Sequence, residues 1–201
     1  MPELTGRHPS GDAAFSFYTE LPFVVKDSDR LRFGRQGELP LFTVTGEYDD
    51  TAKNHCAAVC LTNLTAALSA VTGRQLLENG SPQETFRVYH GMVGNGPVAS
   101  ISGAWSRYGK ERGLQLRSRP VRNYADVQEA ISMGHPCAIL LTDGPLEWHW
   151  VTVTGWAEGE GHYTLRIHDG WNLRDDRYYD LSSRPMWITG REYYIGVYEH
   201  D

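Results

Sequence analysis

The chain has too little cysteine for a fold built on disulfides. It contains three cysteines in 201 residues, an odd number that cannot all pair within one molecule. Cys56 and Cys60 lie four positions apart on one predicted helix, which suits packing along a helix better than a bridge. No two cysteines have the Cys-x-x-Cys spacing that is typical of zinc sites. The composition therefore excludes a disulfide scaffold.

Excess positive charge and long apolar runs are also missing. Lys and Arg total 19 against 25 Asp and Glu, a net charge of −6, and no basic block occurs. We therefore expect no nucleic-acid partner. No apolar run approaches the ~20 residues that span a bilayer, so we expect no membrane insertion. The first residues lack the apolar core of a signal peptide, which predicts a cytoplasmic protein, or a secreted one if a signal peptide precedes this sequence. The oligomeric state stays open.

The organisation of the chain predicts one domain. Residues 1–20 are polar and rich in Gly and Pro, which indicates a loosely attached N-terminal arm, and residues 21–201 form the predicted domain. A domain of this size buries about 70% of its unfolded surface. Helical patterns dominate about 52–133 and strand patterns about 134–199. This order predicts an α+β fold, with a helical lobe packed on an antiparallel sheet lobe.

Apolar spacing predicts where the elements lie. Apolar residues recur at one face of a helix from Cys56 to about Val71, with Asn54 suited to cap its start and Gly73 its end. Further helices are expected over 82–90, 104–112 and 123–133, and a long glycine-rich loop over 91–103. Strands are expected over 21–25, 39–44, 114–121, 137–142, 149–156, 162–168, 176–180 and 192–199, with a charged hairpin or loop over 26–38.

Cys56 differs from the other cysteines in its position. A lone cysteine in a helix is most often a small core residue, and Cys60 and Cys137 fit that description. Cys56 instead falls in the first turn of its predicted helix, where the amide dipoles converge and stabilise a thiolate. We therefore expect Cys56 to have a lowered pKa and to act as a nucleophile.

Two downstream residues could assist such a thiol. His149 opens a strand-like run, at the edge of a face that valines continue. Asp169 ends the next strand and could orient the His149 imidazole. With eight histidines in the chain, chance proximity is a real alternative, and Asp before Gly is also a common turn. His168 competes with Asp169, but neighbouring strand residues face opposite ways, and we expect Asp169 to face His149.

Other residues are expected to shape a substrate cleft between the two lobes. Trp171 is placed to cover the predicted His–Asp pair and shield it from water. Gly94 and Gly96 belong to the glycine-rich loop and would let a substrate backbone approach closely. We expect this loop to border the cleft near Cys56, although a glycine-rich segment is more often a simple connection.

A metal site is the main chemical alternative. His55, Cys56, His149 and Asp169 together offer the nitrogen, sulfur and oxygen ligands that zinc accepts. No two of them have the short helical spacing that would support this interpretation. We expect no metal and no cofactor, because a thiol nucleophile forms its own covalent intermediate.

The order of these motifs resembles the papain-like cysteine peptidase superfamily. The matching segments are Cys56 at a helix start, His149 through Gly155-Trp156, and Asp169-Gly170-Trp171, which is similar to the Asn-Ser-Trp turn of papain-type enzymes. They most resemble bacterial stand-alone relatives of the bacteriocin-leader (double-glycine) peptidases. The resemblance covers about residues 40–199. It implies a papain-like fold and a thiol hydrolase, most simply a peptidase, that acts on a peptide or another acyl substrate.

The sequence departs from that family near the nucleophile. The family's Gly-Pro after the cysteine is Ala57-Ala58 here, and its upstream Gln, which donates to the oxyanion, has no counterpart between Gln36 and Gln75. Asn54 could take that role with the Cys56 backbone N–H, although a helix N-cap role fits it equally well. An acyltransferase or amidase with the same triad, and a non-catalytic binding module of this fold, therefore stay open.

Overall fold

A computed structural model describes residue 15 and residues 17–34, 40–52, 54–144, 147–174, 176–183 and 186–196. Most of the predicted N-terminal arm and the end of the last predicted strand lie outside these residues. The helices are α2 (Cys56–Thr72), α3 (Pro82–Val93), α4 (Ser102–Glu111) and α5 (Tyr124–Ser132), with short 3-10 turns η1 (Thr45–Glu47) and η2 (Glu78–Gly80). The strands are β1 (Asp27–Arg30), β2 (Leu116–Pro120), β3 (Cys137–Thr142), β4 (Trp148–Gly159), β5 (His162–His168), β6 (Arg177–Asp180) and β7 (Met186–Ile195).

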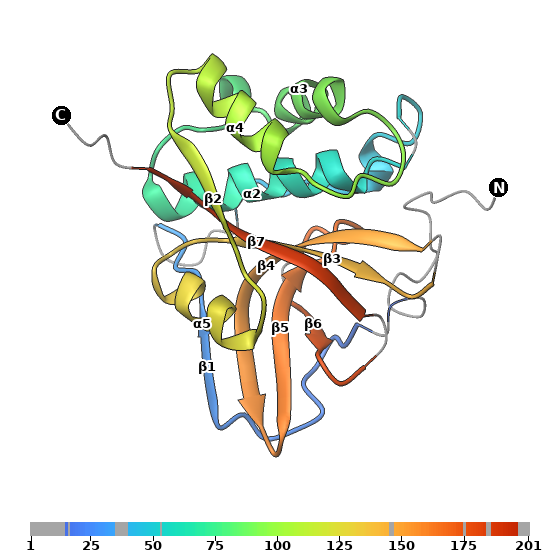
Figure 1. Cartoon of the computed structure of the whole chain (residues 1–201), viewed down its shortest axis with the longest axis vertical. Coiled ribbons are helices and arrows are strands. Elements are labelled where there is room, and N and C mark those ends of the chain that lie inside the picture. Colours follow the sequence, from blue (N-terminus) through green and yellow to red (C-terminus); the bar gives the residue numbers. More distant parts are fainter. Residues whose placement is uncertain are drawn as a thin grey trace.

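The strands form one antiparallel sheet. Its order is β2-β7-β3-β4-β5-β6, and β1 pairs with the outer half of β4. In Figure 1, α2, α3 and α4 lie together at one end of the sheet, and α5 lies beside β1. The expected α+β fold, with helices packed on an antiparallel sheet, is confirmed.

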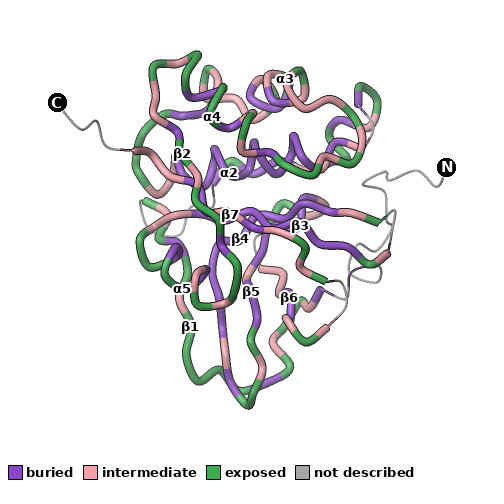
Figure 2. Tube along the Cα trace, viewed as in Figure 1, coloured by how far each residue is buried: buried purple, intermediate pink, exposed green. Residues whose placement is uncertain are grey.

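Helix α2 lies at the centre of the molecule. Ala58, Leu61 and Leu64 are 0% exposed and belong to a cluster that includes side chains of α3 and α4. Ala66 and Ala67 join a second cluster with β3, β4 and β5. A helix that is apolar on most sides is a buried helix, and Figure 2 shows the buried trace following α2 and the central strands. The helix ends at Gly73 in the left-handed conformation, as predicted (φ 67°).

The first strand lies elsewhere than predicted. No strand is assigned to residues 21–25 or 40–44, and β1 forms instead within the polar stretch expected to be a loop. Pro22 and Pro40 have no backbone N–H to give to a sheet. Among the described strands β1 pairs only with β4, and charged side chains are common on such edge strands.

The remaining elements lie close to their predicted ranges. β3 and β5 match the expected strands over 137–142 and 162–168, and Asn123 caps α5 by accepting from the Asp126 N–H at 2.9 Å. Helix α3 continues through Gly91 to Val93, so the predicted loop over 91–103 is shorter and spans 94–101. Glycine at 91 does not end the helix, because Phe86 and Tyr89 bury one face of α3.

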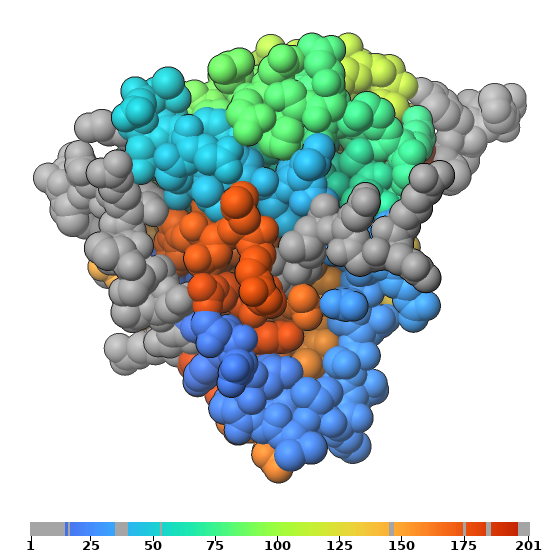
Figure 3. Space-filling model, turned by 180° about the vertical axis from the view of Figure 1, so that it is seen from behind, coloured from blue at the N-terminus to red at the C-terminus, as the bar shows by residue number. Residues whose placement is uncertain are grey.

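The described part of the predicted arm is anchored. Phe15 and Phe17 are each 4% exposed and belong to the core that includes β4 and β5. Tyr18 pairs with Tyr178 of β6 through two backbone hydrogen bonds of 2.9 Å. From behind, the blue N-terminal residues lie against the orange residues of the sheet (Figure 3).

Candidate functional site

Cys56 is the first residue of α2 and is half-buried. The backbone N–H groups of Trp150, Ala57 and Cys56 itself favour the thiolate form of its sulfur. Burial nevertheless raises the pKa of the Cys56 thiol, and these donors lower it only in part. The expectation of a lowered thiol pKa is therefore wrong for this structure, because the desolvation of a thiolate outweighs the helix N-terminus.

His149 lies next to Trp150 at the start of β4 and is 3% exposed. Its Nε2 lies 2.5 Å from the main-chain oxygen of Asp169. A carbonyl oxygen can only accept, so Nε2 donates and carries the proton in the neutral ring. Nδ1 is then the basic nitrogen of His149.

The Asp169 carboxylate organises its own turn. Oδ1 accepts from the backbone N–H groups of Trp171 at 2.8 Å and Asn172 at 2.9 Å. Oδ2 accepts from Asn172 Nδ2 at 2.8 Å and lies 3.8 Å from Arg177 Nε. The structure thus brings Asp169 to His149, but the main-chain carbonyl accepts the Nε2 hydrogen bond and the carboxylate stabilises the turn that presents it.

Aromatic rings enclose the imidazole. The Trp171 ring stacks on His149 with centroids 3.9 Å apart and an angle of 9° between the planes. Phe15 contacts both rings, with centroid distances of 5.5 Å to His149 and 5.6 Å to Trp171. Trp171 therefore covers the imidazole, and the N-terminal segment completes the enclosure, which no sequence pattern indicated.

The glycine-rich loop approaches the residues that flank Cys56. The Gly96 N–H donates to the main-chain oxygen of Asn54 at 3.0 Å. Trp150 Nε1 donates to the Val98 carbonyl at 2.7 Å. Residues 94–101 are thus held near both Asn54 and Trp150. The Gly94 N–H donates to the carbonyl of His90 and so belongs to the end of α3.

The backbone conformation at position 54 favours asparagine. Its φ of 50° lies in the left-handed region, which Asn adopts more readily than most residues. The N-cap of α2 is His55, without a side-chain cap, so the predicted capping role of Asn54 is wrong. Asn54 Oδ1 is buried and has no hydrogen-bond partner among the described residues.

Asn63 is a buried connection that the sequence did not reveal. Its Oδ1 accepts from the Thr43 N–H at 2.9 Å, and its Nδ2 donates to the Thr43 carbonyl at 3.0 Å. The same Nδ2 lies 3.0 Å from His168 Nδ1. Asn63 follows Cys56 by two turns of α2, so it ties the nucleophile helix to the strand that precedes the Asp169 turn.

His168, the competing histidine, has a structural environment. Its Nδ1 also accepts from the Gly170 N–H at 3.2 Å, which fixes the proton of the neutral ring on Nε2. Burial lowers the pKa of His168 to about 4. It is therefore neutral at physiological pH, and its contacts are with Asn63, Gly170 and the ring of Phe42.

A main-chain bridge joins the two halves of the site. The Thr45 N–H donates to the Gly170 carbonyl at 2.8 Å. The Thr45 carbonyl in turn accepts from Nε2 of His55 at 2.9 Å. The residue before Cys56 and the turn after Asp169 are thereby fixed relative to one another through η1.

Neither a metal centre nor a membrane span occurs in the part of the chain that the structure describes. There, no group of three or more His, Cys, Asp or Glu side chains could hold a metal ion. None of the described helices is long and apolar enough to cross a membrane.

Comparisons with known proteins give a distant structural likeness. The sequence matches no protein-family model, and it matches no curated protein. Among solved structures, the chain is similar to the crystal structure of UfSP from C. elegans, with a TM-score of 0.49 and 12% sequence identity. The alignment covers 92% of this chain and 38% of that one. The chain thus spans well under half the length of UfSP, and its function has to be inferred from the geometry of its own site.

Proposed function

We propose that the protein is a cysteine-dependent hydrolase of the papain-like superfamily, most simply a peptidase. The observation that carries the proposal is the place of the Cys56 sulfur. It lies at the N-terminus of α2, and this helix and His149 both approach Gly170: a Cβ atom there would lie 3.5 Å from Val59 Cγ1 and 4.0 Å from His149 Cε1. We propose that the Cys56 thiol pairs with His149, whose Nε2 is held by the Asp169 carbonyl, because nucleophilic catalysis requires a base that can take the thiol proton.

In the proposed reaction, the Cys56 thiol and the His149 imidazole are both neutral before the substrate reacts. Because burial raises the thiol pKa, the resting Cys56 is protonated at neutral pH. His149 Nδ1 takes the thiol proton as the sulfur forms a bond to the substrate carbonyl carbon. The negative charge moves to the carbonyl oxygen, and we assign the Cys56 N–H as its main-chain donor. His149 then gives its proton to the leaving amine, and water cleaves the acyl-enzyme by the same steps in reverse.

The surrounding residues hold the imidazole for both proton transfers. The Asp169 carbonyl keeps the proton of the neutral ring on Nε2. Trp171 and Phe15 fix the plane of the ring and keep water from it. Asn54 stands near the oxyanion position only by its place in the sequence, so its role as a donor is part of the proposal.

The acceptor that completes the reaction is a separate question. An acyltransferase or amidase would share every step up to the acyl-enzyme, since the triad does not choose the acceptor. A relation to the double-glycine peptidases rests on the sequence motifs alone. A binding module without catalysis would form no acyl-enzyme, and this difference gives the test.

The test is acylation of the intact chain by p-nitrophenyl acetate, followed by mass spectrometry. We expect one acetyl group on Cys56, none in Cys56→Ala, and slow acylation in His149→Gln. Cys60→Ala is the matched control, because Cys60 is buried in the same helix and should not affect acylation. Equal acylation of the native chain and Cys56→Ala would overturn the proposal. Release of the acetyl group to water or to an added amine then separates a hydrolase from an acyltransferase.

A further inference from the structure

Four residues occupy paired positions on four neighbouring strands, in a part of the sheet away from the thiol. Arg30 of β1 pairs with Gly155 of β4, Gly155 pairs with Arg166 of β5, and Arg166 pairs with Tyr178 of β6. Residues directly opposite one another on paired strands project from the same face of the sheet. Arg30, Arg166 and Tyr178 are therefore neighbours on one face, although they are far apart in sequence.

Gly155 keeps the space between the two arginines open. A Cβ atom at this position would lie 2.7 Å from the Asp29 carbonyl oxygen and 2.9 Å from the Arg30 Cβ. Any side chain here would thus push β1 away from β4. With glycine, the two arginine-bearing strands flank a position that has no side chain of its own.

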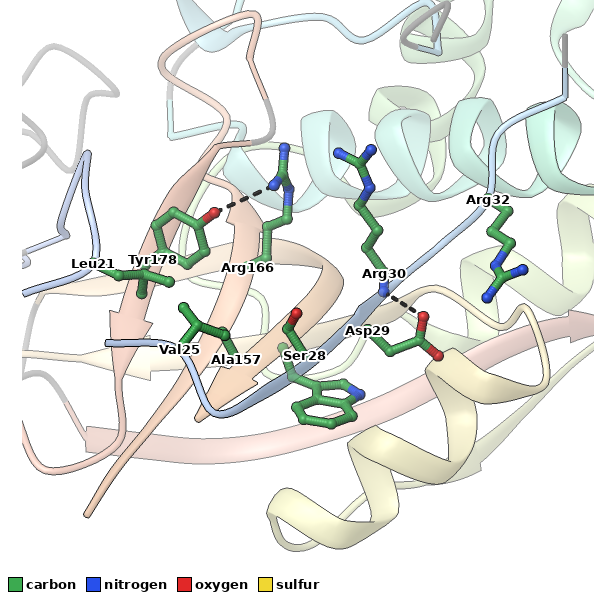
Figure 4. A pocket seen from close by; sticks show the side chains of 10 residues that line it. Leu21, Val25, Ser28, Asp29, Arg30, Arg32, Ala157, Arg166 and Tyr178 are labelled. Carbon is green, nitrogen blue, oxygen red and sulfur yellow. Dashed lines mark hydrogen bonds between the residues drawn. The ribbon is translucent and has the colours of Figure 1, made fainter. Parts of the chain in front are cut away.

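Arg30, Arg166 and Tyr178 also line a cavity of about 560 Å³. Its lining consists of Leu21, Val25, Ser28, Asp29, Arg30, Arg32, Trp156, Ala157, Arg166 and Tyr178. Figure 4 shows the side chains of Arg30 and Arg166 extended in the same direction from their strands, with Leu21 and Val25 on the Tyr178 side. The volume is within the usual range for small-molecule sites, roughly 300–1,000 Å³.

The charge of this cavity is opposite to that of the chain. Three arginines and one aspartate line it, whereas the whole chain has a net charge of −6. The Asp29 carboxylate accepts from the backbone N–H of Arg30 at 2.8 Å. Among the described residues, no carboxylate lies within ion-pair distance of the guanidinium groups of Arg30 or Arg32. Arg30 and Arg32 therefore offer cationic donors to a ligand.

Tyr178 adds a positioned hydroxyl. Its oxygen accepts from Arg166 Nη1 at 3.2 Å, which leaves its own O–H to donate elsewhere. The Arg166 guanidinium also lies 5.9 Å from the centre of the Tyr178 ring. Tyr178 thus restrains Arg166 and supplies a further donor on the same side.

From this geometry we infer that the cavity binds an oxyanion, a carboxylate or phosphate group, carried on a small apolar body. Guanidinium groups match the planar geometry of both anions and hydrogen-bond them in pairs. Arg30, Arg166 and the Tyr178 hydroxyl hold the anion, and Leu21 and Val25 contact the apolar part. Along β4, Gly155 lies six residues from His149, roughly 20 Å at the usual rise of a strand. The site is therefore separate from the thiol and does not depend on the proposed hydrolase.

The experiment is calorimetric titration of the full chain with phenyl phosphate, benzoate, inorganic phosphate and benzyl alcohol. We expect phenyl phosphate or benzoate to bind, inorganic phosphate to bind more weakly than phenyl phosphate, and neutral benzyl alcohol not to bind. The tighter of phenyl phosphate and benzoate identifies the anion. Binding should weaken as salt is added, because the donors are charged. Failure of both aromatic anions to bind would overturn the inference.

Substitutions of the lining residues test whether the anion binds in this cavity. Arg30→Gln and Arg166→Gln should each weaken binding about tenfold or more, since hydrogen bonds to charged groups are the strong ones. Tyr178→Phe removes only the hydroxyl and should have a smaller effect. Arg107→Gln is the matched control, an exposed arginine on α4 that should leave binding unchanged. Equal affinity in all four variants would refute this site, whereas Cys56→Ala should bind normally whether or not the hydrolase proposal holds.

Discussion

At Cys56, burial and hydrogen bonding act on one sulfur atom in opposite directions. Three backbone N–H groups stabilise the thiolate, yet burial keeps the thiol pKa above its ordinary value. Cys60 and Cys137 are fully buried, and burial raises the pKa of Cys60 to about 12. Iodoacetamide should therefore label Cys56 well before the other two in the folded chain.

The pH dependence of this labelling tests the neutral resting pair. Because only the thiolate reacts, a raised pKa means that the labelling rate of Cys56 keeps rising through pH 9. The measurement is the rate of labelling of Cys56 by mapped mass spectrometry from pH 5 to pH 10. A rate that is already constant below pH 7 would show instead that His149 holds a permanent thiolate–imidazolium pair.

Substitution of Asp169 distinguishes whether its carbonyl or its carboxylate orients the His149 imidazole. If the carbonyl orients His149, Asp169→Asn should keep Cys56 acylation within about tenfold, because Asn still accepts from the turn N–H groups. A carboxylate that orients the imidazole directly would instead give a loss of about 10⁴-fold in the same change. Asp169→Ala removes the turn acceptor, and its acylation rate should fall further than that of Asp169→Asn.

The left-handed backbone conformation of Asn54 limits which substitutions can test its side-chain amide. Alanine at a φ of 50° is strained, so Asn54→Gly is the suitable way to remove the amide. If the amide donates to the oxyanion, Asn54→Gly should lower the acylation rate about 10²-fold at unchanged stability. Asn54→Asp should then be slow as well, because an anion would stand near the oxyanion. Normal acylation of both variants would remove Asn54 from the mechanism.

At the scale of elements, the segment from Phe15 to Tyr18 forms part of the site. Phe15 and Phe17 are equally buried, but the ring of Phe15 lies tilted against His149, whereas the ring of Phe17 packs on Phe15, Trp171 and Tyr179. Phe15→Ala and Phe17→Ala should therefore each cost about 3 kcal/mol of stability. Only Phe15→Ala should also slow Cys56 acylation and move the NMR signal of His149 Hε1. Equal effects of both variants on that signal would mean that the segment acts through stability alone.

The sequence correctly predicted those helices and strands that bury apolar side chains at regular positions. The apolar run of β3 and the face of α2 gave correct boundaries, because burial selects apolar residues at regular positions. The polar strand β1 was missed, since its identity comes from backbone pairing with β4. The contact between Asp169 and His149 was expected from strand order, but not that a carbonyl would make it, because a sequence does not reveal which atom of a residue faces a neighbour.

Contacts that depend on register escaped the sequence altogether. The row of Arg30, Arg166 and Tyr178 requires three strand pairings that no local pattern specifies. The left-handed conformation of Asn54 and the contact of Phe15 with His149 likewise depend on tertiary packing. The candidate nucleophile and base were thus recognisable, whereas their surroundings were not.

For the whole molecule, the buried His168 predicts a loss of stability in mild acid. Its pKa is about 4 in the fold and near 6.5 in the unfolded chain, so the unfolded chain binds the proton first as the pH falls. The stability contributed by neutral His168 is complete above pH 6.5 and is lost as the pH falls towards 4. The loss is about 3 kcal/mol at the lower end.

Urea unfolding from pH 7 to pH 4 measures this loss. The asparagine of His168→Asn retains an acceptor near the position of Nδ1 but does not titrate. The urea concentration at the unfolding midpoint should therefore fall less between pH 7 and pH 4 for this variant than for the native chain. His55, whose pKa burial also lowers, contributes in the same direction in both proteins and cancels in the comparison. Parallel curves for the two proteins would show that His168 is not the group responsible.

The order of the sheet sets when the protein can finish folding. β7 lies between β2 and β3, although it follows every other strand along the chain. While a ribosome is still making residues 186–195, β2 cannot join the strands that carry His149, because β7 is the strand between β2 and β3. The nascent chain must therefore keep β2 and the facing edge of β3 unpaired until that segment emerges, and unpaired strand edges favour aggregation.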